Sequence, residues 1–74
     1  MPIRLTRHAR KRAARRRIPM ELIEEVYRDP DEARPSATAP DREVRSRLYD
    51  RQQIEIVVDL GDGSVVSVWM TQVM

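Results

Sequence analysis

IEIVVDLGDGSVVSVWM, at residues 54–70, carries the clearest structural signal in the chain. Every second residue from 54 to 60 is Ile, Val or Leu, as in a strand with one buried face. The Gly-Asp-Gly run at 61–63 is typical of a hairpin turn, and a valine-rich run follows it. The pattern predicts antiparallel strands over residues 54–60 and 64–72, with Val66, Val68 and Met70 in the core and Trp69 on the opposite face.

The segments upstream complete an α+β domain. Residues 43–49 (EVRSRLY) alternate and predict another strand. Thr6 suits a helix N-cap and Pro19 suits a first helical turn, which predicts helices over residues 7–17 and 19–28. Residues 30–41 contain three Pro and no large apolar side chain, and predict a surface loop. We therefore expect one domain over residues 1–74, with a helical hairpin packed on one face of a three-stranded antiparallel sheet.

The composition of the chain excludes several kinds of site and several means of stabilising a small domain. A chain of 74 residues buries a small core and usually needs further stabilisation. It has no Cys and one His, which excludes disulfides, thiolate metal sites and histidine metal clusters, so we expect no metal and no cofactor. A partner protein is the remaining means of stabilisation, either a second copy in a homodimer or a bound antagonist. No signal peptide or apolar run of membrane-spanning length is evident, so a soluble cytoplasmic protein is expected.

Charge is strongly segregated along the chain. Residues 1–17 carry eight Lys or Arg and no acid, whereas residues 20–32 carry six acids against Arg28 alone. Thirteen of the basic residues are Arg, whose planar guanidinium suits phosphate contacts and stacking on bases. A dense positive segment of this kind attracts phosphate backbones, which predicts RNA or another polyanion as a partner.

Helical spacing aligns three candidate catalytic side chains on one edge of the first helix, namely His8, Arg12 and Arg16. A histidine can transfer a proton near neutral pH, and two arginines can stabilise charge that develops on phosphate. The alternative interpretation is that both arginines extend from a packed helix edge while His8 is an ordinary surface residue.

A second set of candidates lies in and beside the 43–49 strand. Arg45, Arg47 and Tyr49 share one strand face, and together with Arg51 they are candidates for an RNA groove in which Tyr49 stacks on a base or transfers a proton. Arg15 is a further candidate for nucleic-acid binding. The alternative is an ordinary solvated sheet face. Trp69 is a candidate base-stacking platform or interface anchor, or a partly buried residue of the outer sheet face.

The run TRHARKRAARRRIPMELIEEVYRDPDE, at residues 6–32, resembles a small bacterial domain of uncharacterised function. That domain has a His-Ala-x-x-Arg motif, then Arg-x-Ile, a short helix ending in Pro-Asp and valine-rich last strands. The matching residues here are His8, Ala9, Arg12, Arg16, Ile18, Pro30 and Asp31. Arg17 and Pro19 stand where the domain often has Gly and Ser or Thr.

The domain looks like a branch of the RelE-like toxin group, within the barnase, EndoU and colicin-type nuclease superfamily. The resemblance implies a helical hairpin on an antiparallel sheet and metal-independent RNA cleavage through the substrate's own 2′-hydroxyl. It implies mRNA as the target, on or off the ribosome, and an acidic antitoxin as the partner. Relatives act on other targets, including topoisomerases. A non-catalytic module for RNA, ribosome or DNA, and a toxin or accessory protein acting on a protein target, are therefore the alternative hypotheses.

Overall fold

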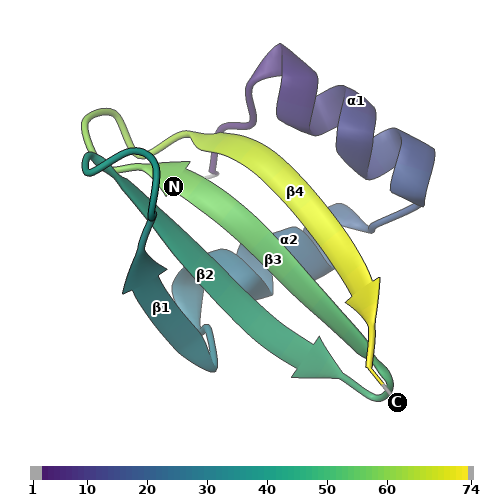
Figure 1. Cartoon of the computed structure of the whole chain (residues 1–74). Helices are drawn as coiled ribbons and strands as arrows, with labels where there is room; N and C mark the ends of the chain where they lie inside the picture. The colour runs from purple at the N-terminus through teal and green to yellow at the C-terminus, as the bar shows by residue number, and fades with distance from the viewer. Residues whose placement is uncertain (1–2, 74) are drawn as a thin grey trace.

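The computed structural model describes residues 3–73, which form two helices followed by four strands (Figure 1). The sheet is antiparallel and its strand order follows the chain, β1-β2-β3-β4. The elements are α1 (Arg7–Arg16), α2 (Met20–Arg28), β1 (Glu32–Pro35), β2 (Arg42–Tyr49), β3 (Gln52–Asp59) and β4 (Val65–Gln72).

Local chemistry sets the helix ends. Thr6 caps α1, because its Oγ1 accepts a hydrogen bond from the backbone N–H of Ala9 over 3.2 Å. Arg17 ends α1 in the left-handed conformation with φ of 57°, and its N–H bonds back to the last turn. Pro19 then occupies the N-cap of α2 in an extended conformation, so the chain turns a tight corner between the helices.

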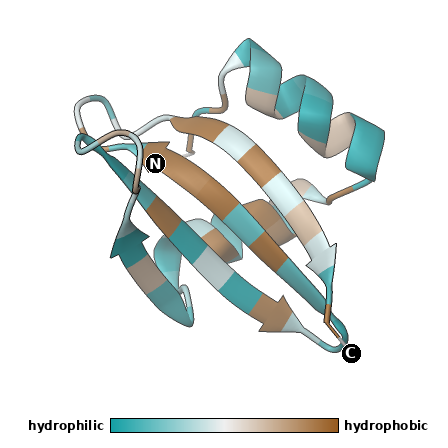
Figure 2. Ribbon diagram, viewed as in Figure 1, coloured by the Kyte–Doolittle hydropathy of each residue, from teal (hydrophilic) through white to brown (hydrophobic). Residues whose placement is uncertain are grey.

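The two helices occupy different positions on the sheet. α2 crosses behind β2 and β3, whereas α1 lies alongside β4 and covers that edge (Figure 1). The apolar side chains between α2 and the sheet form most of the core, and the fully buried ones include Ile23, Val26, Ile54, Ile56 and Val68. Figure 2 shows α1 as almost entirely hydrophilic, in contrast to the hydrophobic bands on β3 and β4. Small side chains, Ala9 and Ala13, let α1 approach the sheet closely.

The segment before α1 is joined to the start of β4. Leu5 forms a parallel bridge with Val65, in which Thr6 N–H donates to Val65 O over 2.9 Å and Val65 N–H donates to Arg4 O over 2.8 Å. These bonds fix the start of α1 relative to the β3–β4 hairpin. They set the direction in which α1 runs along β4.

The sheet differs from the prediction in having four strands rather than three. Residues 32–35 lie in the segment predicted as a loop, but they pair with β2, from Glu32 opposite Ser46 to Pro35 opposite Glu43. All four side chains of β1 are exposed, so no buried apolar side chain holds this edge strand and no apolar alternation marks it in the sequence. Pro35 is compatible with an edge strand, where its missing N–H leaves no broken ladder.

Both helices and the three remaining strands are confirmed, with boundaries shifted by one or two residues. A register irregularity between Val57 and Val58 pairs Val58 with Val65, which buries Val65 completely and leaves Val66 half-buried. The prediction that Val66 belongs to the core is therefore wrong by one position. Neither helix in the described part of the chain is long and apolar enough to cross a membrane.

Candidate nucleic-acid interface

The basic helix surface consists of the cationic side chains of α1 and its C-cap. All of these side chains are exposed except that of Arg12, which is half-buried. None of them forms an ion pair with an Asp or Glu of residues 3–73. The surface comprises Arg7, Arg10, Lys11, Arg12, Arg15, Arg16 and Arg17.

Four arginines of α2 and the sheet have a neighbouring acid, in contrast to the arginines of α1, and these are Arg28, Arg34, Arg45 and Arg47. Arg34 reaches both Glu32 and Glu55, at 3.2 and 3.4 Å. Arg28 pairs with Glu24 one helical turn earlier, at 3.4 Å. The positive charge of the molecule is therefore not spread evenly, because it is neutralised locally around β1 and α2 and left uncompensated on α1.

Trp69 lies under two side chains of the basic helix surface. The guanidinium carbon of Arg12 is 4.8 Å from the indole centroid, and that of Arg16 is 4.4 Å from it. Trp69 pairs with Glu55 in the β3–β4 register, whereas its neighbour Met70 pairs with the buried Ile54. The prediction that Trp69 lies on the face opposite the core is confirmed, and Trp69 is 41% exposed.

His8 occupies the first turn of α1 and is exposed to solvent. It precedes Arg12 by one helical turn and Arg16 by two, so the helix brings the three side chains of the predicted ridge to one side. Both arginines are held against Trp69, whereas His8 lies one turn nearer the N-terminus of the helix. A phosphate bound by the arginines would therefore lie within one turn of the imidazole.

Arg45 lies on the sheet face that α2 covers. Its Nε contacts Glu43 Oε1 at 2.7 Å, and its Nη1 donates to the carbonyl of Tyr27 over 2.8 Å. The guanidinium also stacks on the Tyr27 ring, 4.7 Å from its centroid. Through its contacts with Tyr27, Arg45 attaches β2 to α2.

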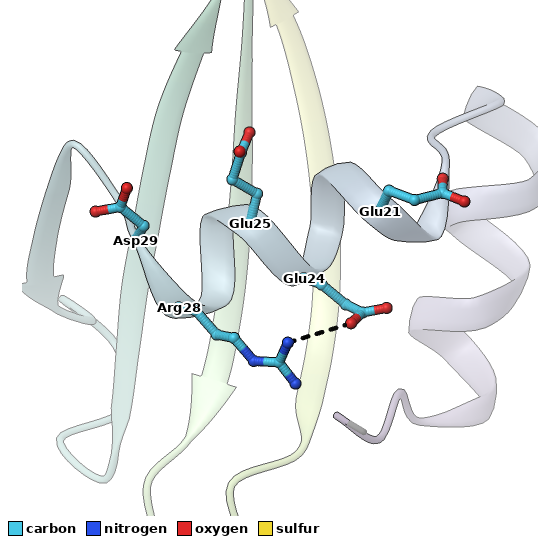
Figure 3. A pocket seen from close by; sticks show the side chains of 5 residues that line it. All are labelled: Glu21, Glu24, Glu25, Arg28 and Asp29. Atoms are coloured by element: carbon cyan, nitrogen blue, oxygen red, sulfur yellow. Dashed lines mark hydrogen bonds and ion pairs between the residues drawn. The ribbon is translucent and has the colours of Figure 1, made fainter. Parts of the chain in front are cut away.

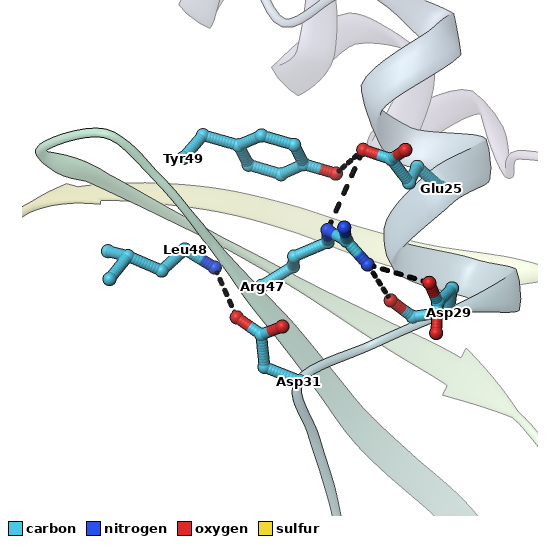
Figure 4. Close-up of polar contacts among 6 residues, drawn as sticks. All are labelled: Glu25, Asp29, Asp31, Arg47, Leu48 and Tyr49. Atoms are coloured by element: carbon cyan, nitrogen blue, oxygen red, sulfur yellow. Dashed lines mark hydrogen bonds and ion pairs between the residues drawn. The ribbon is translucent and has the colours of Figure 1, made fainter.

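Arg47 and Tyr49 also connect β2 to α2 (Figure 4). Arg47 donates to the backbone carbonyl of Asp29 and to its carboxylate, the latter over 3.0 Å, and lies 3.6 Å from Glu25. The hydroxyl of Tyr49 donates to Glu25 Oε1 over 2.6 Å. Burial, and then the hydrogen bond to this carboxylate, raise the pKa of Tyr49 to about 12. The phenol is a poor proton donor or acceptor near neutral pH under these conditions.

The predicted catalytic residues therefore lie in two separate parts of the structure. Tyr49, on β2, is directed to α2, whereas His8, Arg12 and Arg16 belong to the helix beside β4. β3 lies between those two strands. Among the predicted RNA-binding residues, Arg15 is exposed on α1 and Arg51 is exposed in the turn between β2 and β3.

The acidic side chains of α2 form a surface of opposite sign. Glu21, Glu24, Glu25 and Asp29, with Arg28, line an open depression of about 350 Å³ (Figure 3). Within residues 3–73, no group of three His, Asp or Glu side chains is arranged to hold a metal ion. The acids of α2 instead serve the contacts to Arg47, Tyr49 and Arg28 described above.

Nothing in the sequence connects Trp69 with the His8, Arg12 and Arg16 ridge, whereas the structure places Trp69 against Arg12 and Arg16. Helical spacing alone shows that Arg12 and Arg16 share a side, but it does not show which strand lies beside the helix. In comparisons with known proteins, no family model matches this chain, and neither a curated protein nor a solved structure matches it.

Proposed function

We propose that this chain binds RNA through the basic helix surface. The observation that carries the proposal is the contrast between α1, whose cationic side chains have no acidic partner within residues 3–73, and Arg28, Arg34, Arg45 and Arg47, which all have one. Uncompensated arginines on one helix bind phosphates by releasing counterions and by bidentate hydrogen bonds. An RNA strand running along α1 would meet these side chains in succession.

The test compares two variants that remove arginines of different kinds. Arg7→Gln/Arg10→Gln/Arg15→Gln removes exposed, unpaired cations, whereas the control Arg34→Gln removes one that is already paired with acids. RNA affinity would be measured by fluorescence anisotropy over a range of salt concentrations. We expect the triple variant to reduce the slope of log K against log salt by about two, at about 0.7 per phosphate contact on a single strand. Equal affinities for wild type and triple variant would contradict the proposal.

A second candidate function is that of a RelE-like toxin, a metal-independent ribonuclease acting on mRNA. The position of His8, exposed and one turn from Arg12, favours it. In that reaction the imidazole of His8 takes the proton of the 2′-hydroxyl. The 2′-oxygen attacks the adjacent phosphorus, and the 5′-oxygen of the next nucleotide leaves and takes up a proton. Arg12 and Arg16 would neutralise the charge that accumulates on the phosphoryl oxygens.

The toxin proposal also includes a partner. An acidic antitoxin segment laid along α1 would cover the uncompensated charge and block access to His8. Such a segment would also stabilise this small domain by binding only its folded form. Co-expression with a candidate acidic partner should raise the midpoint of thermal unfolding and abolish RNA binding. A complex that still binds RNA with unchanged affinity would argue against α1 as the covered surface.

A further inference from the structure

Two uncompensated guanidinium groups share one aromatic ring at the edge of the sheet. Arg12 and Arg16 lie 4.8 and 4.4 Å from the centroid of Trp69. Neither has an ion pair with an acidic side chain of residues 3–73. Like charges held close together repel each other, and an anion between them would relieve that repulsion. The indole thus holds the two arginines close together, where a bound anion is stabilised because it relieves their mutual repulsion.

Stacking on the indole does not use up the hydrogen-bonding groups of the arginines. A guanidinium placed over a ring keeps its N–H donors in its own plane, directed away from the ring centre. Those donors match the oxygens of a phosphate group. The ring also removes much of the rotational freedom of two long side chains, so less entropy is lost when the anion binds.

Trp69 keeps part of its surface exposed, beside the two arginines that lie over its ring. Trp69 is 41% exposed, and it lies on the sheet face opposite Ile54, Ile56 and the helix α2. An exposed aromatic ring next to phosphate-binding groups suits an unpaired nucleobase, because every base has a face that can stack. A base inside a duplex is stacked on both sides and does not offer that face.

We propose that Trp69, Arg12 and Arg16 form a site for one nucleotide of single-stranded RNA, with the phosphate on the guanidinium groups and the base on the indole. This inference rests on the proposed RNA binding and adds a preference for unpaired strands. Trp69 acts as both a base contact and a positioning residue for the two arginines. Other cations of the basic helix surface then bind the neighbouring phosphates without regard to base.

The experiment uses the full chain. Affinities of all variants are measured by the anisotropy of a labelled RNA, directly or in competition, and quenching in wild type is read from Trp69, the only Trp in the sequence. The probes are a single-stranded RNA of about ten nucleotides, a duplex of the same length, and inorganic polyphosphate, which has charge but no base. We expect the single strand to quench Trp69 and to bind roughly tenfold more tightly than polyphosphate. Trp69→Leu should lose that advantage, and Trp69→Phe should retain most of it. Far-ultraviolet circular dichroism would establish that both variants are folded.

The outcomes separate this inference from the proposal on which it rests. If wild type binds the single strand without quenching and Trp69→Leu binds all probes as wild type does, the nucleotide site is wrong and RNA binding by α1 stands. The site is also wrong if duplex and single strand bind equally in every variant. If wild type binds no RNA at moderate salt, the proposed function itself fails.

Discussion

The hydroxyl of Tyr49 donates a hydrogen bond to Glu25 Oε1 over 2.6 Å, and so joins β2 to α2. The same carboxylate lies 3.6 Å from Nε of Arg47. The guanidinium carbon of Arg47 is in turn 5.7 Å from the centroid of the Tyr49 ring. Three side chains that the sequence presents as separate thus form one connection between helix and sheet. Their arrangement indicates a structural role for Tyr49 and Arg47.

Tyr49→Phe should remove the hydrogen bond and keep the ring. We expect a loss of about 1 kcal/mol in the free energy of unfolding at pH 7, the usual effect of one such bond. The pKa of Tyr49 is raised from about 10 to about 12 in the folded state, so the protonated phenol is the form that the fold favours. Its contribution to stability is complete below pH 10 and is lost as the pH rises toward 12.

Urea unfolding of wild type and Tyr49→Phe at several pH values would measure both effects. The two proteins should differ at pH 7 and converge in alkaline solution. A difference that stays constant up to pH 12 would show that the hydroxyl proton is not what stabilises the contact.

Arg47→Gln should affect stability more than RNA binding. The change removes the contacts to Asp29 and Glu25 and leaves two acids of α2 without a cation. We expect a small loss in the free energy of unfolding, because charge-assisted hydrogen bonds are lost at a partly exposed site where solvent screens the charges. The RNA affinity of the folded protein, measured by anisotropy below the unfolding transition, should stay within about twofold of wild type, since phosphate contacts are assigned to α1. Arg51→Gln, in an exposed turn, is the matched control for stability.

Thr6→Ala should weaken the start of α1. Its Oγ1 accepts from Ala9 N–H and also donates to Val66 O over 3.4 Å, so the side chain connects helix and sheet. Loss of such a cap costs about 1 kcal/mol, and Thr6→Ser, which retains the hydroxyl, should lose much less. Amide hydrogen exchange in the first turn of α1 would locate the effect. Equal losses for Ala and Ser would assign it to the methyl group instead.

Gly63→Ala should destabilise the β3–β4 hairpin. Gly63 has φ of +76°, and a Cβ there would lie 3.2 Å from the hydroxyl of Tyr27, which donates to Gly63 O over 2.8 Å. The left-handed backbone alone costs about 1–2 kcal/mol for a residue with a side chain. Gly61→Ala is the control, because its Cβ would meet only the carboxylate of Asp59, at 3.0 Å, which can move. Thermal unfolding should place Gly63→Ala well below Gly61→Ala.

Much of the fold follows from local patterns. Three local signals each indicate one element that the structure contains. The cap at Thr6 indicates the start of α1, the corner at Pro19 indicates the start of α2, and the alternation in residues 54–58 indicates β3. β1 escapes such reasoning because its side chains are all exposed, so its sequence records no buried face. An edge strand of this kind is specified by the partner strand, through backbone hydrogen bonds that depend little on the type of side chain.

The candidate site was harder to predict than the fold. Alternation separates Arg45, Arg47 and Tyr49 from the other face of their strand but does not tell which face meets a helix. A basic face is ordinarily solvated, yet here Arg45 pairs in register with the buried Ile56, beneath α2. Glu25 and Asp29 compensate Arg47, whereas Arg45 is compensated by Glu43 of its own strand. The acidic composition of residues 20–32 was the available signal for the Arg47 contacts.

The ribonuclease proposal depends on His8, and its test must separate catalysis from binding. His8→Ala removes the proposed base and keeps every Lys and Arg of the basic helix surface, so RNA affinity should stay close to that of wild type. Cleavage, followed as new 5′ ends in cellular RNA after induction, should fall by roughly a hundredfold or more, the usual contribution of a general base.

Arg15→Gln is the matched control for the His8 experiment. It removes an exposed cation from the same helix, so it should weaken binding modestly and leave the rate at saturating RNA unchanged. A wild type that arrests growth without new 5′ ends would leave RNA binding as the activity of α1. New ends that persist in His8→Ala would assign the chemistry to other groups, because an imidazole that is absent cannot take the 2′-hydroxyl proton.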